Sequence, residues 1–381
     1  MARQGQRKKS VRGGGSVFLR KDGRWEAKFK VEETGKYKSL YAATETEAYK
    51  LLEEAKYQQK QGTLATGRDQ TIKQFLEYWL EDVEKPTVRL STYISNRILL
   101  RKHLVPGLGH IHLQKLTASH LQSFYARKLR EGTSAGRIRA MNSVLHKALD
   151  HARHPLKIVG VNVASGLELP HRERYKGPVL EVEQARVLLV RARERDLDAL
   201  IALALVAAMR KGEILGLRWS DIDLITGKVQ IARTLNYSAG YGFFEGKPKT
   251  ETSERVVMLP RFLVGLLHTH RTHQLKLKFV MGSKWVERDL VFCRDNGDFI
   301  VPHTFLRHFY RLLDDAGLPR MHFHDLRHSA ATILLSMGVP PNMVQELLGH
   351  SDIATTLGIY GHVLPSTRKE TLDRMDGLYG G

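Results

Sequence analysis

Apolar and polar residues alternate most clearly over residues 24–31. The apolar positions are Trp25, Ala27, Phe29 and Val31, and the polar positions between them are Arg24, Glu26, Lys28 and Lys30. Such alternation predicts a β-strand with one buried face and one mostly basic face. Asp22-Gly23 is a strong hairpin turn signal before this strand. A third short strand is expected from about Tyr37 to Tyr41, after a turn at Gly35.

Thr44-x-x-Glu47 follows as a capping box, which predicts a helix that reaches about Gln59. We therefore expect residues 16–62 to fold as a three-stranded sheet with one helix. Residues 1–15 are basic and rich in glycine, and a disordered arm is expected there. Because a β-sheet can enter the major groove of DNA, the basic face is a candidate DNA-binding surface. An ordinary solvated face would have the same pattern.

Helical spacing replaces the alternation after a linker at residues 62–70. Apolar residues recur every three to four positions at Ile72, Phe75, Leu76, Trp79, Leu80 and Val83, and again at Ile138, Met141, Val144, Leu145 and Ala148. Residues 70–168 are therefore predicted to form an all-α helical bundle. A second linker, residues 167–180, is basic and bounded by prolines.

The pattern becomes mixed from about residue 181 onward. A long apolar helix is expected over "LDALIALALVAAM", short strands at "KVQIAR" and "ERVVMLP", and helices toward the end of the chain. We expect residues 177–381 to form a mixed α/β domain that is mainly α. The predicted fold class is multidomain, with a small sheet-and-helix domain, a helical bundle and this third domain.

Charge narrows the class of partner. The 381 residues include 60 Lys and Arg against 40 Asp and Glu, which gives a net charge of +20 and a pI near 9.9. Such an excess favours a polyanionic partner, with nucleic acid first. An anionic membrane surface is the alternative, but no Lys-rich amphipathic helix with an aromatic face is evident.

The single cysteine, Cys293, allows no intramolecular disulfide and no cysteine-based zinc site, and it suits a reducing cytoplasm. No apolar run is long enough to predict a transmembrane helix. The basic N-terminal stretch lacks the apolar core of a secretory signal, so none is expected.

Four segments of the C-terminal region occur in an order that is more specific than any one of them. They are "MRKGEILGLRWSDID", "KPKTETSERVVMLP", "HDLRHSAAT" and "LLGHSDIATTLGIYGHV". The His-x-x-Arg spacing of the third segment is weak alone, because it also begins at His171, His268 and His308. Together the four segments resemble the catalytic domain of the tyrosine recombinases, specifically the phage-type integrases.

The resemblance extends upstream. Residues 70–170 are similar to the helical core-binding domain of that family, and residues 16–62 resemble the arm-binding domain of integrases that recognise two classes of DNA site. Three positions depart from the family pattern. Ala208 stands where glycine is more usual, Val163 where proline commonly follows an asparagine, and Gly358 where polar residues are common.

The resemblance implies a catalytic set. Its members are Arg210, Lys249, His324, Arg327, His350 and Tyr360, with Tyr360 as the nucleophile. The chemistry gives each residue type a reason. Two permanently charged arginines can donate paired hydrogen bonds to the non-bridging oxygens of a phosphodiester under attack. Neither a metal nor a nucleotide cofactor is then required.

Proton transfer accounts for the remaining members of the set. A phenol is mostly protonated at neutral pH and needs a proton acceptor, for which His324 is suited. The leaving 5′-hydroxyl needs a proton donor, which Lys249 on a mobile hairpin could supply. His350 would hydrogen-bond the scissile phosphate.

Other interpretations of single residues stay open. Arg210 could instead pair with Glu213, three residues further on, and Lys247 competes with Lys249 for the acid role. Tyr360 taken alone could be a simple packing residue. His322, His328 and His362 flank the motifs but fit none of them, so we expect supporting or surface roles for these histidines.

Six basic residues are predicted to bind DNA. They are Arg24, Lys28 and Lys30 of the sheet face and Arg172, Arg174 and Lys176 of the second linker. As in the family, double-stranded DNA with core and arm sites is the expected partner. The expected assembly is a homotetramer that acts through a Holliday junction. A DNA-bending protein and a directionality factor are further expected partners.

The sequence thus predicts an integrase that cuts and rejoins DNA through a 3′-phosphotyrosyl intermediate, and integrates and excises a phage or other mobile element. The expected location is the cytoplasm of a bacterial host, in association with the nucleoid. A type IB-like topoisomerase or a resolvase with the same chemistry is one alternative. A non-catalytic DNA-binding regulator is another, which the intact catalytic set argues against. A metal-dependent nuclease is disfavoured, because no carboxylate cluster has metal-ligand spacing.

Overall fold

The computed structural model describes residues 9–11, 15–32, 35–67, 69–173, 175, 177–246 and 254–349. The chain divides into two compact units, Met1–Arg174 and Tyr175–Gly381. The boundary between the units falls inside the predicted second linker. Separate arm-binding and core-binding domains within the first unit stay predictions.

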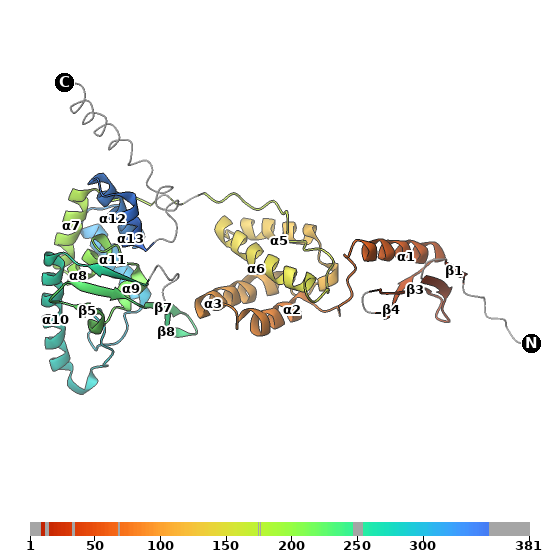
Figure 1. Ribbon diagram of the computed structural model, residues 1–381, viewed down its shortest axis with the longest axis horizontal. Helices are drawn as coiled ribbons and strands as arrows, with labels where there is room; N and C mark the ends of the chain where they lie inside the picture. The colour runs from red at the N-terminus through yellow and green to blue at the C-terminus, as the bar shows by residue number, and fades with distance from the viewer. Residues whose placement is uncertain are drawn as a thin grey trace, which may run out of the picture. The chain divides into compact units, whose positions relative to one another are not determined.

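The first unit begins with an antiparallel sheet in the order β1-β2-β3-β4. Its strands are β1 (Lys9–Val11), β2 (Gly15–Leu19), β3 (Trp25–Lys30) and β4 (Tyr37–Ala42), and helix α1 (Glu45–Lys60) follows them. Helix α1 covers one face of the sheet (Figure 1), where Ala27 and Phe29 are buried against Leu52. Gly23 and Gly35 have φ angles of +83° and +68°, which suit the two tight turns between β2, β3 and β4.

Two details of this sheet correct the expectations. The three predicted strands are present as β2, β3 and β4, but β1 adds a fourth strand, so the disordered arm predicted for residues 1–15 is wrong for residues 9–11 and 15. The edge of β2 provides unpaired backbone groups, and the extended segment Lys9–Val11 pairs with them. Glu26, expected on the solvated face, is only 8% exposed. Arg20 and Ser39 both donate hydrogen bonds to its carboxylate and cover it.

The rest of the first unit is helical, as predicted. Its helices are α2 (Ile72–Tyr78), α3 (Leu90–Leu99), α4 (Val105–Leu108), α5 (Ala118–Arg130) and α6 (Ala135–Arg153), with π-helical segments at Trp79–Glu84 and Leu100–Leu104 and a 3₁₀ turn at Leu113–Lys115. Thr71, Thr117 and Ser134 cap the first turns of α2, α5 and α6 through their hydroxyl groups. The predicted apolar stripes form the core, apart from Val83, which is only partly buried.

The second unit combines helices with two small sheets. Its helices are α7 (Val182–Arg193), α8 (Asp198–Leu205), α9 (Lys211–Leu215), α10 (Arg261–Met281), α11 (Pro302–Asp315), α12 (Asp325–Ser336) and α13 (Pro341–Leu348), and its 3₁₀ turns are Trp219–Asp221 and Gly282–Lys284. Its strands are β5 (Ile222–Asp223), β6 (Lys228–Ile231), β7 (Thr234–Ser238), β8 (Gly242–Gly246) and β9 (Arg255–Met258). The sheets have the orders β5-β6-β9 and β7-β8.

Strands β6 and β9 are those predicted, whereas the β7-β8 hairpin was not expected. The predicted apolar helix is also shorter than its sequence pattern, and α8 ends at Leu205. Ala208, three residues later, has a φ of +49°, which a right-handed helix cannot contain. This turn directs the chain into Arg210. The fold class is confirmed: a small sheet and a helical bundle are followed along the chain by a mixed α/β unit that is mainly helical.

Helices α12 and α13 lie side by side (Figure 1). A small apolar cluster joins them to the turn after α8. Its buried members are Ala208, Ala330, Ala331, Leu335, Val344 and Leu348. The backbone of Ala208 and the C-terminal end of α13 are thereby held close to each other. In the described part of the chain, no helix is both long and apolar enough to cross a membrane.

Candidate active site

Arg210 lies at the start of α9, directly after the left-handed turn at Ala208. Its backbone N–H donates to Glu213 Oε2 at 2.9 Å, and its side-chain Nη1 donates to Glu213 Oε1 at 2.7 Å. The pairing with Glu213 that the sequence left open is therefore present. Arg210 also lines a cavity and donates from Nη2 to the carbonyl oxygen of Gly349 at 3.2 Å. The ion pair orients this guanidinium and leaves it at the cavity wall.

His324 and Arg327 stand at the beginning of α12 but have different surroundings. His324 precedes the helix, is exposed and lines the same cavity as Arg210. The Arg327 side chain is buried, with 1% exposure. It donates hydrogen bonds to the carbonyl oxygens of Ala208 and Leu348. Although the two residues are only three positions apart, the burial of Arg327 gives it a different role from that of His324.

Both arginines thus meet the C-terminal end of α13. Gly349 ends this helix in the left-handed conformation, with a φ of +59°. Arg327 contacts the carbonyl oxygen of Leu348, and Arg210 contacts that of Gly349. The last carbonyls of a helix lack intrahelical partners and carry partial negative charge, so they are suitable acceptors for arginine. The chain continues from this point into His350.

The cavity next to these residues has a volume of about 580 Å³. Elements α9, β7, β8 and α11 line it together with the segment before α12. Besides Arg210 and His324, it is bordered by Lys211, Asn236, Tyr237, Phe243, Tyr310 and His322. Positive, polar and aromatic side chains therefore surround a space large enough for a phosphodiester and parts of its neighbouring sugars.

His324 is held in its neutral form. Its cavity side is open to solvent, but burial of the rest of the ring, followed by the neighbouring His328, Arg327 and Arg210, lowers its pKa to about 4. The rings of His324 and His328 meet edge to face, with centroids 4.9 Å apart. A neutral imidazole at the cavity wall can accept a proton at neutral pH.

Arg255, in β9, is a residue of this site that the sequence did not single out. It donates to both oxygens of Glu213 from Nη1 and Nη2, and to the carbonyl oxygen of Leu347 from Nε. Burial raises the pKa of Glu213, but the charge of Arg255 and then the hydrogen bonds from Arg210 and Arg255 hold that pKa below its ordinary value. The sequence signal for Arg255 was only that it is a basic residue within the segment "KPKTETSERVVMLP".

Two family models match the chain. The model described as phage integrase family matches residues 179–367, and the model described as phage integrase, N-terminal SAM-like domain matches residues 71–129. The chain belongs to the phage integrase family. The resemblance found in the four sequence motifs is thereby confirmed.

Individual phage integrases and related recombinases are similar over most of the chain. A tyrosine recombinase XerC-like protein of Caldanaerobacter subterraneus subsp. tengcongensis is 27% identical over 91% of this chain and 94% of its own length. The solved Tn1549 transposon integrase in complex with a circular intermediate DNA has a TM-score of 0.68 at 18% identity, over 80% of this chain and 99% of that chain. A lambda integrase tetramer bound to a Holliday junction has a TM-score of 0.56 at 17% identity, over 90% and 94%. These structures share the fold.

Three members of the predicted catalytic set of this integrase lie outside the described residues. They are Lys249, His350 and Tyr360, and Lys247, Gly358 and His362 lie there too. The described chain stops on both sides of the lysine segment, at the end of β8 and the start of β9. It also stops at Gly349, one residue before His350. The structure thus brings together Arg210, His324 and Arg327.

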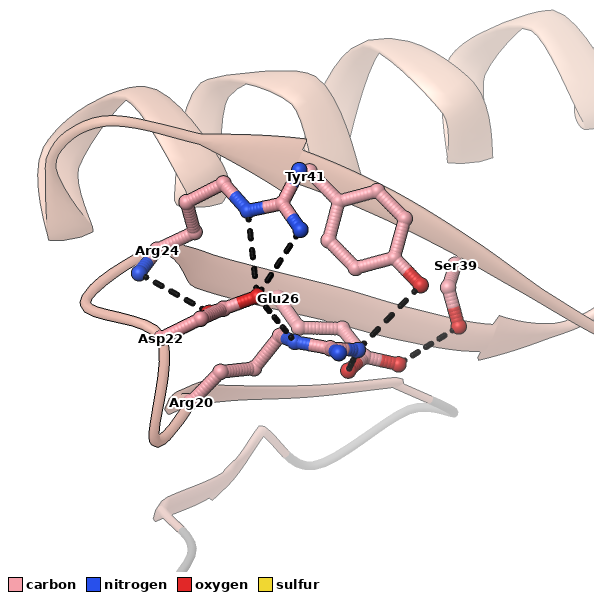
Figure 2. A network of polar contacts seen from close by, with 6 residues as sticks. All are labelled: Arg20, Asp22, Arg24, Glu26, Ser39 and Tyr41. Atoms are coloured by element: carbon pink, nitrogen blue, oxygen red, sulfur yellow. Dashed lines mark hydrogen bonds and ion pairs between the residues drawn. The ribbon is translucent and has the colours of Figure 1, made fainter.

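The integrase carries three of its predicted DNA-binding residues on the face of the N-terminal sheet that α1 does not cover. Arg24, Lys28 and Lys30 are exposed there. Lys28 lies over the ring of Tyr37, with its Nζ 5.4 Å from the ring centroid, and Arg24 lies over Tyr41 at 5.4 Å. Figure 2 shows that Asp22 holds the guanidinium of Arg24 and that Arg20 bridges to Glu26 and Tyr41. This face is basic and aromatic.

The other three predicted DNA-binding residues belong to the second linker. Arg172 is exposed and borders a groove at the start of α6, together with Ser134 and Arg137. Arg174 and Lys176 lie outside the described residues. No group of three or more His, Cys, Asp or Glu that could hold a metal ion occurs among the residues that the structure describes.

Proposed function

We propose that this integrase recombines double-stranded DNA at specific sites through a 3′-phosphotyrosyl intermediate. Tyr360 would attack the scissile phosphate and release a 5′-hydroxyl. A 5′-hydroxyl of a partner strand would then attack the phosphotyrosyl link and restore a phosphodiester. Because one phosphodiester is exchanged for another through the enzyme, the reaction conserves bond energy and needs no nucleotide cofactor.

The observation that carries this proposal is the convergence of Arg210 and Arg327 beside His324. Arg210 and His324 line one cavity, and the two guanidinium groups contact neighbouring carbonyls at the end of α13. Attack at phosphorus increases the negative charge on the non-bridging oxygens, and oriented arginines stabilise that charge. The neutral ring of His324 provides an acceptor for the phenolic proton of Tyr360.

The remaining roles rest on the family motifs. Lys249 would donate a proton to the leaving 5′-oxygen, and His350, which follows Gly349, would hydrogen-bond the scissile phosphate. His350 directly follows Gly349, whose carbonyl oxygen accepts a hydrogen bond from Arg210, and Lys249 lies six residues before Arg255. The order of these segments along the chain supports the assignment.

Exchange of strands between two duplexes implies four protomers on DNA. The lambda integrase tetramer bound to a Holliday junction provides the model for this assembly. Core sites would be bound by the helical bundle, the second linker with Arg172, Arg174 and Lys176, and the catalytic unit. Arm sites would be bound by the basic face of the N-terminal sheet. A DNA-bending protein and a directionality factor would bring arm and core sites together and select integration or excision.

Formation of a covalent protein–DNA adduct tests this function. The DNA that flanks the coding region is sequenced to find a short repeat that marks the recombination junction. A duplex that contains this junction is the substrate. A nick near the junction makes the adduct accumulate. The full chain, incubated with end-labelled substrate in EDTA, should give a protease-sensitive adduct on a denaturing gel. Tyr360→Phe should bind this DNA and form no adduct.

Two results would contradict the proposal: an adduct that survives in Tyr360→Phe, or a requirement for a divalent metal ion in the wild-type chain. Rejoining distinguishes the alternatives. A topoisomerase would relax supercoiled DNA without exchanging strands between two sites. A regulator without catalytic activity would bind the junction and form no adduct.

A further inference from the structure

Two arginines from different motifs share the buried carboxylate of Glu213, which is 3% exposed. Arg210 contacts it at 2.7 Å and Arg255 at 3.2 Å. The side chain of Arg210 is 31% exposed and lines the cavity, whereas that of Arg255 is 7% exposed. Arg255 is therefore enclosed in protein, while Arg210 faces the space that DNA would occupy.

A buried carboxylate needs a compensating positive charge. Among the interactions that lower the pKa of Glu213 against the effect of burial, the charge of Arg255 comes first, ahead of the hydrogen bonds from Arg210. If Arg255 were absent, this demand would fall on Arg210. If the Arg210 guanidinium alone had to neutralise Glu213, it would be less free to donate hydrogen bonds to the phosphate oxygens in the transition state.

Arg255 also connects three segments of the site. Its own strand, β9, follows the lysine segment, and Arg255 is the sixth residue after Lys249. Its Nε donates to the carbonyl oxygen of Leu347 at 3.0 Å, three residues before His350. Its Nη atoms reach Glu213 in α9. The side chain of Arg255 thus links strand β9 to helix α9 and to the end of α13.

We infer that Arg255 is a positioning residue for the strand-cleavage step. It neutralises Glu213 and fixes the end of α13, so that Arg210 remains available to the scissile phosphate. The inference rests on the proposed function and adds a residue that acts through Arg210 without touching the DNA.

A double-mutant cycle on the full chain tests this role, with Arg255→Met, Glu213→Gln and the double variant. The probe is the nicked junction duplex, and the readouts are the single-turnover rate of adduct formation at saturating DNA and the dissociation constant for the DNA. Urea midpoints report folding. Arg233→Met is a matched control, because Arg233 pairs with the carboxylate of Asp221, which is 10% exposed, in the same unit.

Arg255→Met should lower the saturating rate about tenfold or more, while the dissociation constant changes less than about threefold. In the Glu213→Gln background the same substitution should lower the rate less than about threefold, because the buried charge that Arg255 neutralises is gone. Arg255→Lys, which keeps the charge, should recover part of the rate. Arg233→Met should stay within about threefold of the wild-type rate.

Equal losses in the two backgrounds would assign Arg255 a merely structural role and overturn the inference, as would a wild-type rate in Arg255→Met. A wild-type chain that forms no adduct would overturn the proposed function itself, and the inference with it. If Arg255→Met does not fold, Arg255→Lys takes its place in the cycle, because lysine lacks the forked donors that reach both oxygens of Glu213. A smaller loss of rate in the Glu213→Gln background than in the wild-type background would then support the inference, and equal losses would overturn it.

Discussion

The hydroxyl group of Tyr175 donates a hydrogen bond of 3.0 Å to the buried carboxylate of Asp325. Asp325 directly follows His324 and also accepts from the backbone N–H of His322 at 2.7 Å. The rings of Tyr175 and His322 meet edge to face at 4.5 Å. The first residues of the second unit are therefore fastened to the start of α12, where His324 faces the cavity.

Gly177 gives this attachment a sharp test. A Cβ atom at residue 177 would lie 2.6 Å from the carboxylate carbon of Asp325, which is too close for any real contact. Gly177→Ala should lower the free energy of unfolding by about 1–3 kcal/mol and slow adduct formation, because Asp325 and the start of α12 must move. Urea unfolding and single-turnover cleavage measure the two effects.

The matched control for this substitution is Gly265→Ala in α10, where a Cβ would meet no atom within 4 Å. It should be neutral or stabilise the protein by up to about 1 kcal/mol, because alanine favours helix over glycine. A Gly177→Ala protein as stable and active as this control would show that the attachment of residues 175–177 does not position His324.

The depressed pKa of His324 predicts a stability change with pH. In the unfolded chain the ring takes up a proton as the pH falls through about 6.5, whereas in the folded protein its pKa is about 4. The contribution of the neutral ring to stability is therefore complete above pH 6.5 and is lost as the pH falls toward 4. Asp325, whose charge acts in the opposite direction, does not reverse this order.

Urea midpoints at pH 7 and pH 5 measure the effect. The wild-type protein should lose more stability between these two values than His324→Gln, which has no ring to protonate. His328→Gln is a parallel variant, because burial lowers the pKa of His328 as well. An identical pH dependence for the wild type and His324→Gln would mean that His324 titrates normally in the folded chain.

The assignment of Lys249 as the acid predicts a substrate-specific rescue. Lys249→Ala should block cleavage of an ordinary junction but not of one whose bridging 5′-oxygen is replaced by sulfur, because a thiolate leaves without a proton. Comparing the two substrates in the adduct assay measures this. Lys247→Ala is the control and should cleave both. Equal defects on both substrates would remove Lys249 from the acid role.

The uncovered face of the N-terminal sheet should bind a second class of DNA site. Replacing Lys28 and Lys30 by Gln should weaken binding to arm-site DNA and reduce the slope of log K against log salt by about 0.9 for each phosphate that the protein no longer neutralises. Core-site cleavage should remain. Filter binding over a salt series measures the slope.

Lys50 and Lys60 provide the control for charge alone, since both are exposed on α1, which covers the other face of the sheet. Their replacement by Gln changes the net charge equally and should leave the slope nearly unchanged. If the two pairs of substitutions have the same effect, the binding depends on overall charge and not on the sheet face.

Local patterns predicted strands β2, β3, β4, β6 and β9, the helical bundle and the cap at Thr44, because side-chain periodicity reports directly on which face is buried. They were less successful where distant groups decide the outcome. Glu26 is buried because Arg20 and Ser39, which lie outside its own strand, bond to it. The early end of α8 depends on Ala208, an alanine in a conformation that usually favours glycine. Its place in the family pattern was the only sequence signal for that turn.

The site shows the same division. Motif order predicted Arg210, His324 and Arg327 as site residues, and the structure brings these three close together. It also shows that the pairing of Arg210 with Glu213 coexists with a place at the cavity wall. Arg255 was missed because its function depends on Glu213 and Leu347, which lie 42 and 92 positions away in sequence. No local spacing encodes a side chain that bridges such segments.

The end of α13 sets a limit on how the length of this chain can change. Arg255, Arg327 and Arg210 reach the carbonyl oxygens of three consecutive residues, Leu347, Leu348 and Gly349. Inserting or deleting one residue within α13 would rotate its last carbonyls by about 100°, because a helical turn contains about 3.6 residues. All three carbonyl oxygens would then point away from the arginines that now donate to them, and the three hydrogen bonds would be lost together. Single-residue insertions and deletions should therefore be tolerated far less in α13 than at the exposed turn around Gly240, where a Cβ would meet no atom within 4 Å.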